Sequence, residues 1–400
     1  MFEDAHHTVH LPQEILLKIF SSLKSDRCTL KSCSLVDKAW NQAIRTHLFH
    51  SIDLSAILGR NDWLSFFINA PFDVGDLVRQ VIVKDTSWDH SFASTSTLVL
   101  SHFATSLSSL TLSNLSIADF ADFASTIPKF KQLRTLSLKH VCWETNSVDL
   151  DEPILPRHTF PATVTTLHLF HLDLGELFGW LLAHTQPLTP TKVYIGPVEY
   201  QWKRFICSFF VRYISSITEL GFLLPDSSTA LEPYSLCSSE AWMEGAFGAK
   251  ASLSPELYKI TERFQARHGF SIHSTQRGVI GPGCRILRVH QFLFHLGDNR
   301  ARTSPTVLFA RVFLTLEGFR GSLLLDVDVP NTRAMSALNI DWEFIDDVLS
   351  AETHKDIKAV VFVAVTDIRL SALESFISEK LAKSYGRGLL RFERGENMCT

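Results

Sequence analysis

The sequence predicts an α/β fold in which a short all-helical module precedes a longer array of strand–helix units. Two patterns predict it: helical spacing of apolar residues near the start, and a short strand template that returns several times further on. Composition agrees with a packed protein, since 46% of the 400 residues are hydrophobic and 30 are Phe. The predicted organisation is a disordered segment at 1–10, a helical domain at 11–54, a helical linker at 55–76 and an α/β region at 77–400.

The first predicted helix begins near Pro12, because proline is suited to the first turn, where its missing N–H is not needed. Apolar residues then follow at intervals of one helical turn and form a wide stripe. They are Ile15, Leu16, Ile19, Phe20 and Leu23.

Two further short helices are predicted before residue 50. Ser25 or Asp26 can cap the first of them, and Asp37 can cap the second, which begins near Ala39 and Trp40. The apolar residues of the middle helix are Leu30, Cys33, Leu35 and Val36. A domain of about 40 residues without disulfides or a metal seldom stabilises itself. Part of its apolar surface must therefore pack either on the rest of the chain or on another protein.

The stretch "LPQEILLKIF" (11–20), continued by "CSLVDKAW" (33–40), resembles an F-box, and "RTHLFHSIDL" (45–54) is similar to the end of F-box-like domains of mushroom-type fungi. The resemblance implies that this domain docks on a Skp-type adaptor, which links it to a cullin and a RING subunit. The residues that it implies for adaptor binding are Leu11, Pro12, Ile15, Leu16, Ile19, Leu30, Val36 and Trp40.

A template of the form apolar-x-x-apolar-x-apolar recurs along the middle of the chain. Its copies are Val78/Val81/Val83, Leu107/Leu110/Leu112, Leu133/Leu136/Leu138, Val164/Leu167/Leu169 and a weaker Ile217/Leu220/Phe222. The last gap has room for two units of about 26 residues, and helix-like segments at 117–130 and 174–185 lie between copies. Each unit predicts a strand followed by a returning helix, and such units must stack to bury their apolar faces.

This pattern resembles a leucine-rich-repeat solenoid in degenerate form, because Leu115, Val141 and Leu172 stand where that family has asparagine or cysteine. The predicted fold class is therefore an N-terminal three-helix F-box followed by an irregular leucine-rich-repeat-like α/β solenoid. An ordinary α/β sheet with accidental spacing is the alternative.

Residues 226–283 fit the template poorly and predict an irregular insertion, with a helix near 255–267. Strand signals return afterwards and alternate with helical ones. The predicted strands are 284–294, 306–316, 322–329, 357–365 and 389–394, and the predicted helices are 342–352 and a last one that ends at Gly386.

The sequence predicts neither a catalytic centre nor a cofactor, since it lacks a P-loop, Gly-x-Ser-x-Gly and His-Glu-x-x-His. The 17 histidines do not have zinc-site spacing: His6, His7 and His10 lie at the start, and His168 and His171 near a strand end. Cys28 and Cys33 are expected to be small core residues rather than metal ligands. Trp88 and Trp143 each follow a template strand and are candidate contacts for a target protein, because such contacts favour tryptophan.

Charge and hydropathy exclude several classes of partner. The net charge of −4 without a basic block argues against nucleic acid, and no apolar run is long enough to cross a membrane. The first residues do not resemble a signal peptide, and the seven scattered cysteines suit a reducing compartment, so we expect a cytoplasmic or nuclear protein.

The resemblance thus implies a non-enzymatic substrate receptor of an SCF-type ubiquitin ligase, which binds the adaptor and a target protein. Two alternatives stay open at this point. One is a scaffold that binds the adaptor without a ligase role, and the other is an unrecognised hydrolase or transferase in residues 226–400.

Overall fold

The computed structural model describes most of the predicted elements in two compact units. One unit comprises residues 1–137 and 141–146, and the other comprises residues 138–140 and 147–400. The described residues are 11–23, 26–55, 74–88, 102–117, 119–143, 159–170, 175–183, 188–196, 208–209, 212–213, 215–223, 250–251, 254–268, 275–276, 284–290, 319–327, 329, 331–337 and 340–395. The predicted disordered segment at 1–10 and most of the predicted linker at 55–76 lie outside them.

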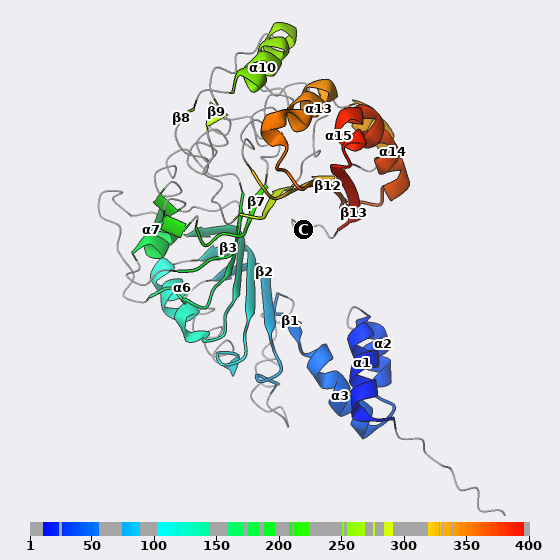
Figure 1. Cartoon of the computed structure of the whole chain (residues 1–400). Helices are drawn as coiled ribbons and strands as arrows, with labels where there is room; N and C mark the ends of the chain where they lie inside the picture. Colours follow the sequence, from blue (N-terminus) through cyan, green and yellow to red (C-terminus); the bar gives the residue numbers. More distant parts are fainter. Residues whose placement is uncertain are drawn as a thin grey trace, which may run out of the picture. The chain divides into compact units, whose positions relative to one another are not determined.

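The first unit begins with three helices, α1 (Gln13–Ser22), α2 (Arg27–Cys33) and α3 (Lys38–Leu48), which pack together (Figure 1). The Asp26 carboxylate accepts the N–H of Thr29 at 3.0 Å and starts α2. The Asp37 carboxylate accepts the N–H groups of Ala39 and Trp40 and starts α3. These are side-chain caps of the first turn, and they confirm the three predicted helices.

Two details of the helical prediction are wrong. Pro12 precedes the first helical residue and so is not in the first turn of α1. Leu35 and Val36 lie in the turn between α2 and α3, because α2 ends at Cys33 and their N–H groups bond to the carbonyls three residues earlier. Asp37 has the extended backbone of a helix cap, so the helical backbone cannot run from this turn directly into α3.

The first strands follow one another in chain order as β1 (Ser51–Asp53), β2 (Gln80–Trp88), β3 (Ser109–Ile117) and β4 (Thr135–Trp143), and only residues 138–140 of β4 belong to the second unit. The β1–β2 and β2–β3 pairs are parallel. Helix α6 (Phe120–Thr126) and the short 3₁₀ helix η1 (Ile127–Lys129) follow β3, as the segment 117–130 predicts. The first three template copies are fully buried, which confirms that they point into the core.

Strands β2, β3 and β4 each contain a non-glycine residue with a left-handed backbone at the same template position. These residues are Asp85 (φ 52°), Asn114 (φ 52°) and His140 (φ 50°). In β3 the inward residues are Leu110 and Leu112 before this position and Leu115 and Ile117 after it. One residue is thus bulged out, and the alternation changes phase. This phase change explains why the predicted strands are shorter than the observed ones.

The bulge also determines which side chains point inward after it. Leu115 and Val141, each 1% exposed, fill the inward position after the bulge, whereas Leu172 lies outside the described residues. The residues at the bulge, one position before Leu115 and Val141, carry polar side chains. On the surface there, the Asn114 side-chain amide donates a hydrogen bond to the Asp85 carboxylate at 2.7 Å.

The second unit contains strands in the order β5-β6-β7-β10-β11-β12-β13, and each neighbouring pair is parallel. Their bounds are β5 (Thr166–Phe170), β6 (Lys192–Ile195), β7 (Glu219–Leu223), β10 (Ile286–His290), β11 (Ser322–Val327), β12 (Ala359–Ala364) and β13 (Leu390–Arg394). The sequence has room for an extra unit between the fourth and fifth copies of the template, and strand β6 lies there. Pro190, just before this strand, and Val193 and Ile195 within it are buried at the template spacing. The predicted strand 306–316 lies outside the described residues.

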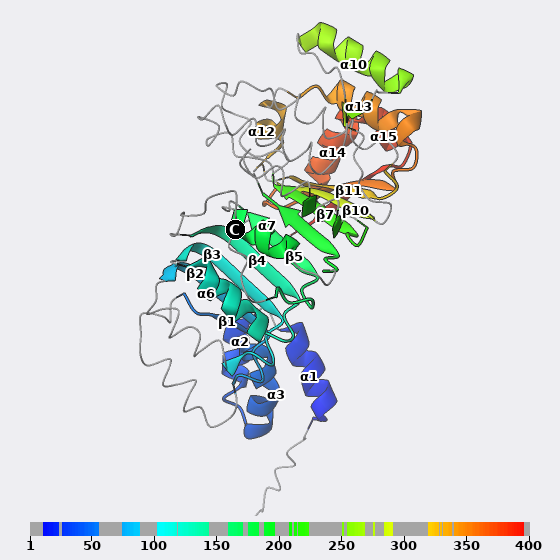
Figure 2. The ribbon, with the colours of Figure 1, turned by 90° about the vertical axis from the view of Figure 1, so that its left-hand side faces the viewer.

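Helices α13 and α14 lie on the same side of strands β10 and β11 (Figure 2). The helices of this unit are α7 (Gly175–Leu182), α10 (Pro255–His268), α12 (Thr332–Ala337), α13 (Trp342–Ser350), α14 (Leu370–Lys380) and α15 (Ala382–Gly386), with a 3₁₀ turn η3 at Glu352–His354. Helix α10 confirms the helix predicted inside the insertion, where β8 (Lys250–Ala251) and β9 (Thr275–Gln276) also pair. The last predicted helix is two helices in the structure, because the helical backbone is interrupted at Leu381.

Successive strands start with the same hydrogen-bond arrangement. The carbonyl of Arg79 accepts the N–H groups of Ser108 and Ser109 at 2.8 and 2.9 Å, and that of Thr191 accepts those of Thr218 and Glu219 at 2.8 and 3.0 Å. This repetition fixes the register of the parallel strands. The solenoid and leucine-rich-repeat character of the region remains a prediction.

We expect Asn114→Val to destabilise the first unit by about 1–2 kcal/mol, because a β-branched residue is strained at φ 52°. Asn114→Gly loses the same amide contact with Asp85 but removes the strain, so it serves as the matched control. Urea unfolding of the full chain measures both. Equal stabilities of the two variants would contradict the strained-bulge interpretation.

Candidate functional site

The three N-terminal helices share a small core of their own. It comprises Leu16, Phe20, Leu30, Ala43 and Ile44, with Leu23, Cys33, Trp40 and Leu48 packed around it. The Phe20 and Trp40 rings meet edge to face, with centroids 5.5 Å apart. This contact joins α1 to α3 and is the aromatic centre of the module.

Large apolar side chains remain exposed around this core. Among the described residues, the exposed ones are Leu11, Ile15, Leu17, Ile19, Leu35, Val36, Tyr258 and Tyr385. The first six all lie between residues 11 and 36, and we call these six the docking set. Large exposed apolar side chains that gather in one short stretch of the sequence indicate an interaction site.

Helix α1 presents apolar residues on two faces because Ile15 and Ile19 alternate with Leu16 and Phe20. Leu16 and Phe20 are 4% and 0% exposed and face the core, whereas Ile15 and Ile19 are 42% and 41% exposed. The stripe expected from the sequence is thus divided between an inner and an outer face.

The structure separates the predicted adaptor-binding residues into two groups. Leu11, Pro12, Ile15, Ile19 and Val36 are exposed, with Val36 at 62%. Leu16 and Leu30 are buried in the core of the module, and Trp40 is partly buried against it. Burial by the domain itself leaves Leu16 and Leu30 without a free face for a partner, whereas part of Trp40 remains exposed.

Leu17 and Leu35 belong to the docking set and were missed. Leu17 falls outside the four-residue spacing that identified Ile15 and Ile19, and its exposed fraction is 37%. Leu35 was assigned to the middle helix, but in the turn its side chain is 86% exposed. The Asp37 cap directly after it was the signal that a turn stands there.

Trp143 is not available as a contact for a target protein, which corrects that prediction. It is 3% exposed and packs against Phe120 and Phe123 of α6, with ring centroids 4.9 and 5.4 Å away. The bulge at His140 shifts the strand alternation and turns Trp143 inward. Trp88 ends β2, and its side chain lies outside the described part of the structure.

Within the described ranges, no cluster of three His, Cys, Asp or Glu side chains could hold a metal ion. His168 stacks on Tyr194 with centroids 4.4 Å apart, and His6, His7, His10 and His171 lie outside the described residues. No described helix is long and apolar enough to span a membrane.

The cysteine expectation is half right. Cys33 packs against the core of the module, as expected, but Cys28 is exposed. In the second unit, Cys284 is buried, and burial raises the pKa of its thiol to about 11.

Buried polar groups of the second unit pair with one another on neighbouring strands. The Tyr194 hydroxyl contacts the Glu219 carboxylate, which also pairs with Lys192 at 2.9 Å. Burial, together with this contact, raises the pKa of Tyr194, so the phenol stays protonated and donates. Arg288 and Asp326 form a buried ion pair at 2.9 Å. These groups satisfy one another, which is the pattern of a structural network.

The comparison with protein families decides the nature of the N-terminal module. The family model described as F-box-like matches residues 8–55. The module is an F-box-like domain. This match includes the whole docking set, and F-box domains bind Skp-type adaptors. No curated protein matches the sequence.

Core and surface of the F-box-like domain are expected to respond differently to mutation. Phe20→Ala removes a ring that is 0% exposed and should destabilise the domain by about 3–5 kcal/mol. Leu35→Ser, at 86% exposure, should change stability by less than about 0.5 kcal/mol. Circular dichroism during urea titration measures both, and a large loss for Leu35→Ser would show that the turn packs on the chain itself.

Thiol labelling is expected to follow burial. At pH 8 a maleimide should modify Cys28 rapidly and Cys284 slowly, because the raised pKa leaves less of the Cys284 thiolate and burial blocks access. Peptide mass spectrometry of the native chain over time resolves the two sites. Equal rates in the native chain, before unfolding, would contradict the burial of Cys284.

Proposed function

We propose that this chain is the substrate-recognition subunit of an SCF-type ubiquitin ligase. In this proposal the F-box-like domain binds the Skp-type adaptor through the docking set, and the α/β region holds a target protein. The single observation that carries the proposal is the set of uncovered apolar side chains within residues matched by the F-box-like family.

The free energy available from the docking set is consistent with a protein partner. Full burial of a large apolar side chain is worth about 1.5–3 kcal/mol, and these six side chains are 37–86% exposed. Together they correspond to about three fully exposed side chains, so their burial provides roughly 5–9 kcal/mol, which lies in the lower half of the cost of association of about 4–15 kcal/mol. A stable complex thus requires an adaptor groove that covers nearly the whole set and adds polar contacts.

The F-box-like domain has few apolar residues left for its own stability once the docking set is subtracted. Its core consists of five buried residues and four partly buried ones. Covering the docking set would therefore also stabilise the domain, since a partner that binds only the folded state shifts the folding equilibrium.

The proposed mechanism is proximity, and it makes no use of a catalytic residue in this chain. F-box proteins are generally non-catalytic adaptors. The adaptor connects the chain to the cullin and the RING subunit, which recruits a ubiquitin-conjugating enzyme. A target bound to the α/β region is then held near that enzyme, so that a bimolecular encounter becomes effectively intramolecular.

Three further parts of the proposal concern the rest of the chain. The parallel α/β region is proposed to be a degenerate leucine-rich-repeat solenoid, on the basis of the recurring template and the matching strand starts. A cytoplasmic or nuclear location is proposed because the seven scattered cysteines suit a reducing compartment. A fungal F-box family is proposed from the sequence resemblance at 45–54.

We expect Ile19→Asp to weaken adaptor binding by at least about 100-fold, because it places a charge in an apolar interface. Ser21→Asp, on the same helix and also exposed, adds the same charge without removing an apolar group and is the matched control. Titration of immobilised adaptor with each full-length variant measures both. Retained binding of Ile19→Asp would show that α1 is not the docking helix.

Target turnover separates a substrate receptor from a scaffold. Proteins that co-purify with the full chain are followed by quantitative mass spectrometry before and after inactivation of the cullin. If the chain is a receptor, some of the proteins that it binds should accumulate when the cullin is inactive. They should also accumulate when the Ile19→Asp variant replaces the native chain. Unchanged levels of every bound protein would contradict the ligase role and leave adaptor binding alone.

A further inference from the structure

Strand β13 is the last strand in the order of the sheet, and it lies beside β12 (Figure 1). One of its sides pairs with β12, and the other has no neighbouring strand among the described residues. Its sequence, "LRFER", contains no proline, and none of its residues has the left-handed backbone of a bulge. An edge strand without these protections presents N–H and C=O groups on which another strand can pair.

The hydrogen bonds to β12 determine which residues of β13 face the open edge. The Leu389 carbonyl accepts the N–H of Val360 at 2.9 Å, and the Gly395 N–H donates to the carbonyl of Ala364 at 3.0 Å. Along a strand in a sheet, the N–H and C=O groups of successive residues point to alternate sides. The residues whose backbone groups point away from β12 are therefore Leu390, Phe392 and Arg394.

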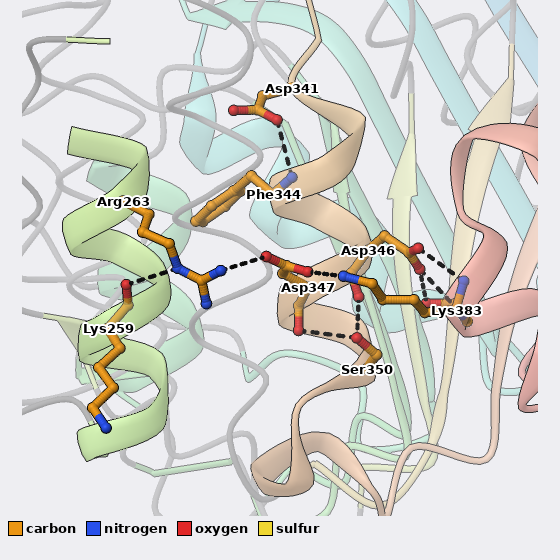
Figure 3. Close-up of polar contacts among 9 residues, drawn as sticks. Lys259, Arg263, Asp341, Phe344, Asp346, Asp347, Ser350 and Lys383 are labelled. Carbon is orange, nitrogen blue, oxygen red and sulfur yellow. Dashed lines mark hydrogen bonds and ion pairs between the residues drawn. The ribbon is translucent and has the colours of Figure 1, made fainter. Parts of the chain in front are cut away.

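Both ends of β13 are held in place by the rest of the second unit. Before the strand, the buried Asp346 carboxylate of α13 accepts the N–H groups of Lys383 and Ser384 at 2.9 Å, which fixes α15 (Figure 3). Gly388, with φ 69°, then turns the chain into the strand, a conformation that glycine adopts without strain. At the other end, the Arg394 guanidinium donates to two backbone carbonyls of the segment that follows β12. The open edge is therefore preformed.

The side chains of β13 differ between its two faces. Arg391 and Glu393 are exposed and lie on the same face, because they are two residues apart. Within the described part of the chain, neither of them has an ion-pair partner. On the other face Leu390 is buried, and the half-buried Phe392 ring stacks on that of Phe362 with centroids 5.8 Å apart. The strand thus offers one cation, one anion and a partly covered aromatic ring.

We propose that β13 pairs with β13 of a second copy of this chain, antiparallel and centred on Phe392. In this register Phe392 lies opposite the same residue of the second copy, and Leu390 lies opposite Arg394. The residues whose backbone groups face the open edge are then hydrogen-bonded to one another across a two-fold axis. The second copy also covers the exposed part of the Phe392 ring.

The charges on β13 favour this register over its neighbours. Arg391 lies opposite Glu393 of the second copy, and the two-fold axis repeats the pair. These are non-hydrogen-bonded positions, where opposite side chains are closest and unlike charges stabilise the pairing. A centre two residues earlier would place Arg391 opposite Leu389. A centre two residues later would place Glu393 opposite Gly395. Only the centre at Phe392 gives both charges a partner.

The pairing goes beyond the proposed function and does not depend on it, since it uses only the edge of the second unit. Each copy contributes a strand of 5 residues, far fewer than the roughly 20–30 residues a side of a standard interface. The dimer should therefore be weak and should form only at high concentrations of the chain. In a ligase, the dimer would bring two target-binding regions into one assembly.

Sedimentation equilibrium of the full chain, both alone and co-expressed with a Skp-type adaptor, measures the pairing. The mass should rise toward that of two copies as the concentration increases. Arg391→Glu and Glu393→Arg should each raise the dissociation constant of the dimer at least about tenfold, because like charges then face each other. The double variant Arg391→Glu/Glu393→Arg should restore it, because the opposite charges are only exchanged. An equimolar mixture of the two single variants should also associate, since each complements the other.

Lys259→Glu is the control for overall charge, since Lys259 is exposed on α10 and its replacement changes the charge as much as Arg391→Glu does. It should leave the dissociation constant of the dimer unchanged. A single copy at submillimolar concentration, equal association of the native chain and both single variants, or a double variant that fails to restore association would each overturn the proposal. Failure of the adaptor to bind would instead contradict the proposed function, since it lowers the mass of each copy without changing the number of copies. Circular dichroism verifies that the variants are folded.

Discussion

The small size of the helical core is the constraint on which the function of the N-terminal domain depends. Three short helices bury one face of α1, with Leu16 and Phe20, and have nothing with which to bury the other, which carries Ile15 and Ile19. The turn after α2 also carries uncovered apolar side chains, since Leu35 and Val36 extend into solvent. These exposed apolar side chains imply a partner that covers them, and the F-box-like match at 8–55 indicates the kind of partner.

A second constraint shapes the α/β region, namely that parallel strands must be joined by returning segments and stacked in register. The chain satisfies it by repeating one hydrogen-bond arrangement at the start of successive strands. It adds a left-handed residue to β2, β3 and β4, which changes the phase of the alternation and lengthens each strand. The same bulge determines that Leu115 and Trp143 face inward, so the exposed polar residues are Asp85 and Asn114.

Sequence patterns predict most of the elements here, because apolar spacing and capping residues are local signals. Asp37 and the template residues from Val78 onward are clear examples. The direction of individual side chains depends on tertiary packing and is much harder to predict. Leu16 and Ile15 look alike in sequence, yet only the position of α3 decides which one is buried. Trp143 was misassigned for a related reason, since no sequence rule marks the bulge at His140.

The central claim is that an adaptor covers the docking set. The measurement that tests it most directly is co-expression of the full chain with a fungal Skp-type adaptor, followed by size-exclusion chromatography and mass determination. We expect a stable one-to-one complex, and aggregation of the chain when the adaptor is omitted. A soluble monomer whose mass does not change in the presence of the adaptor would contradict adaptor docking. The chain would then stay soluble with the apolar residues between 11 and 36 uncovered by a partner.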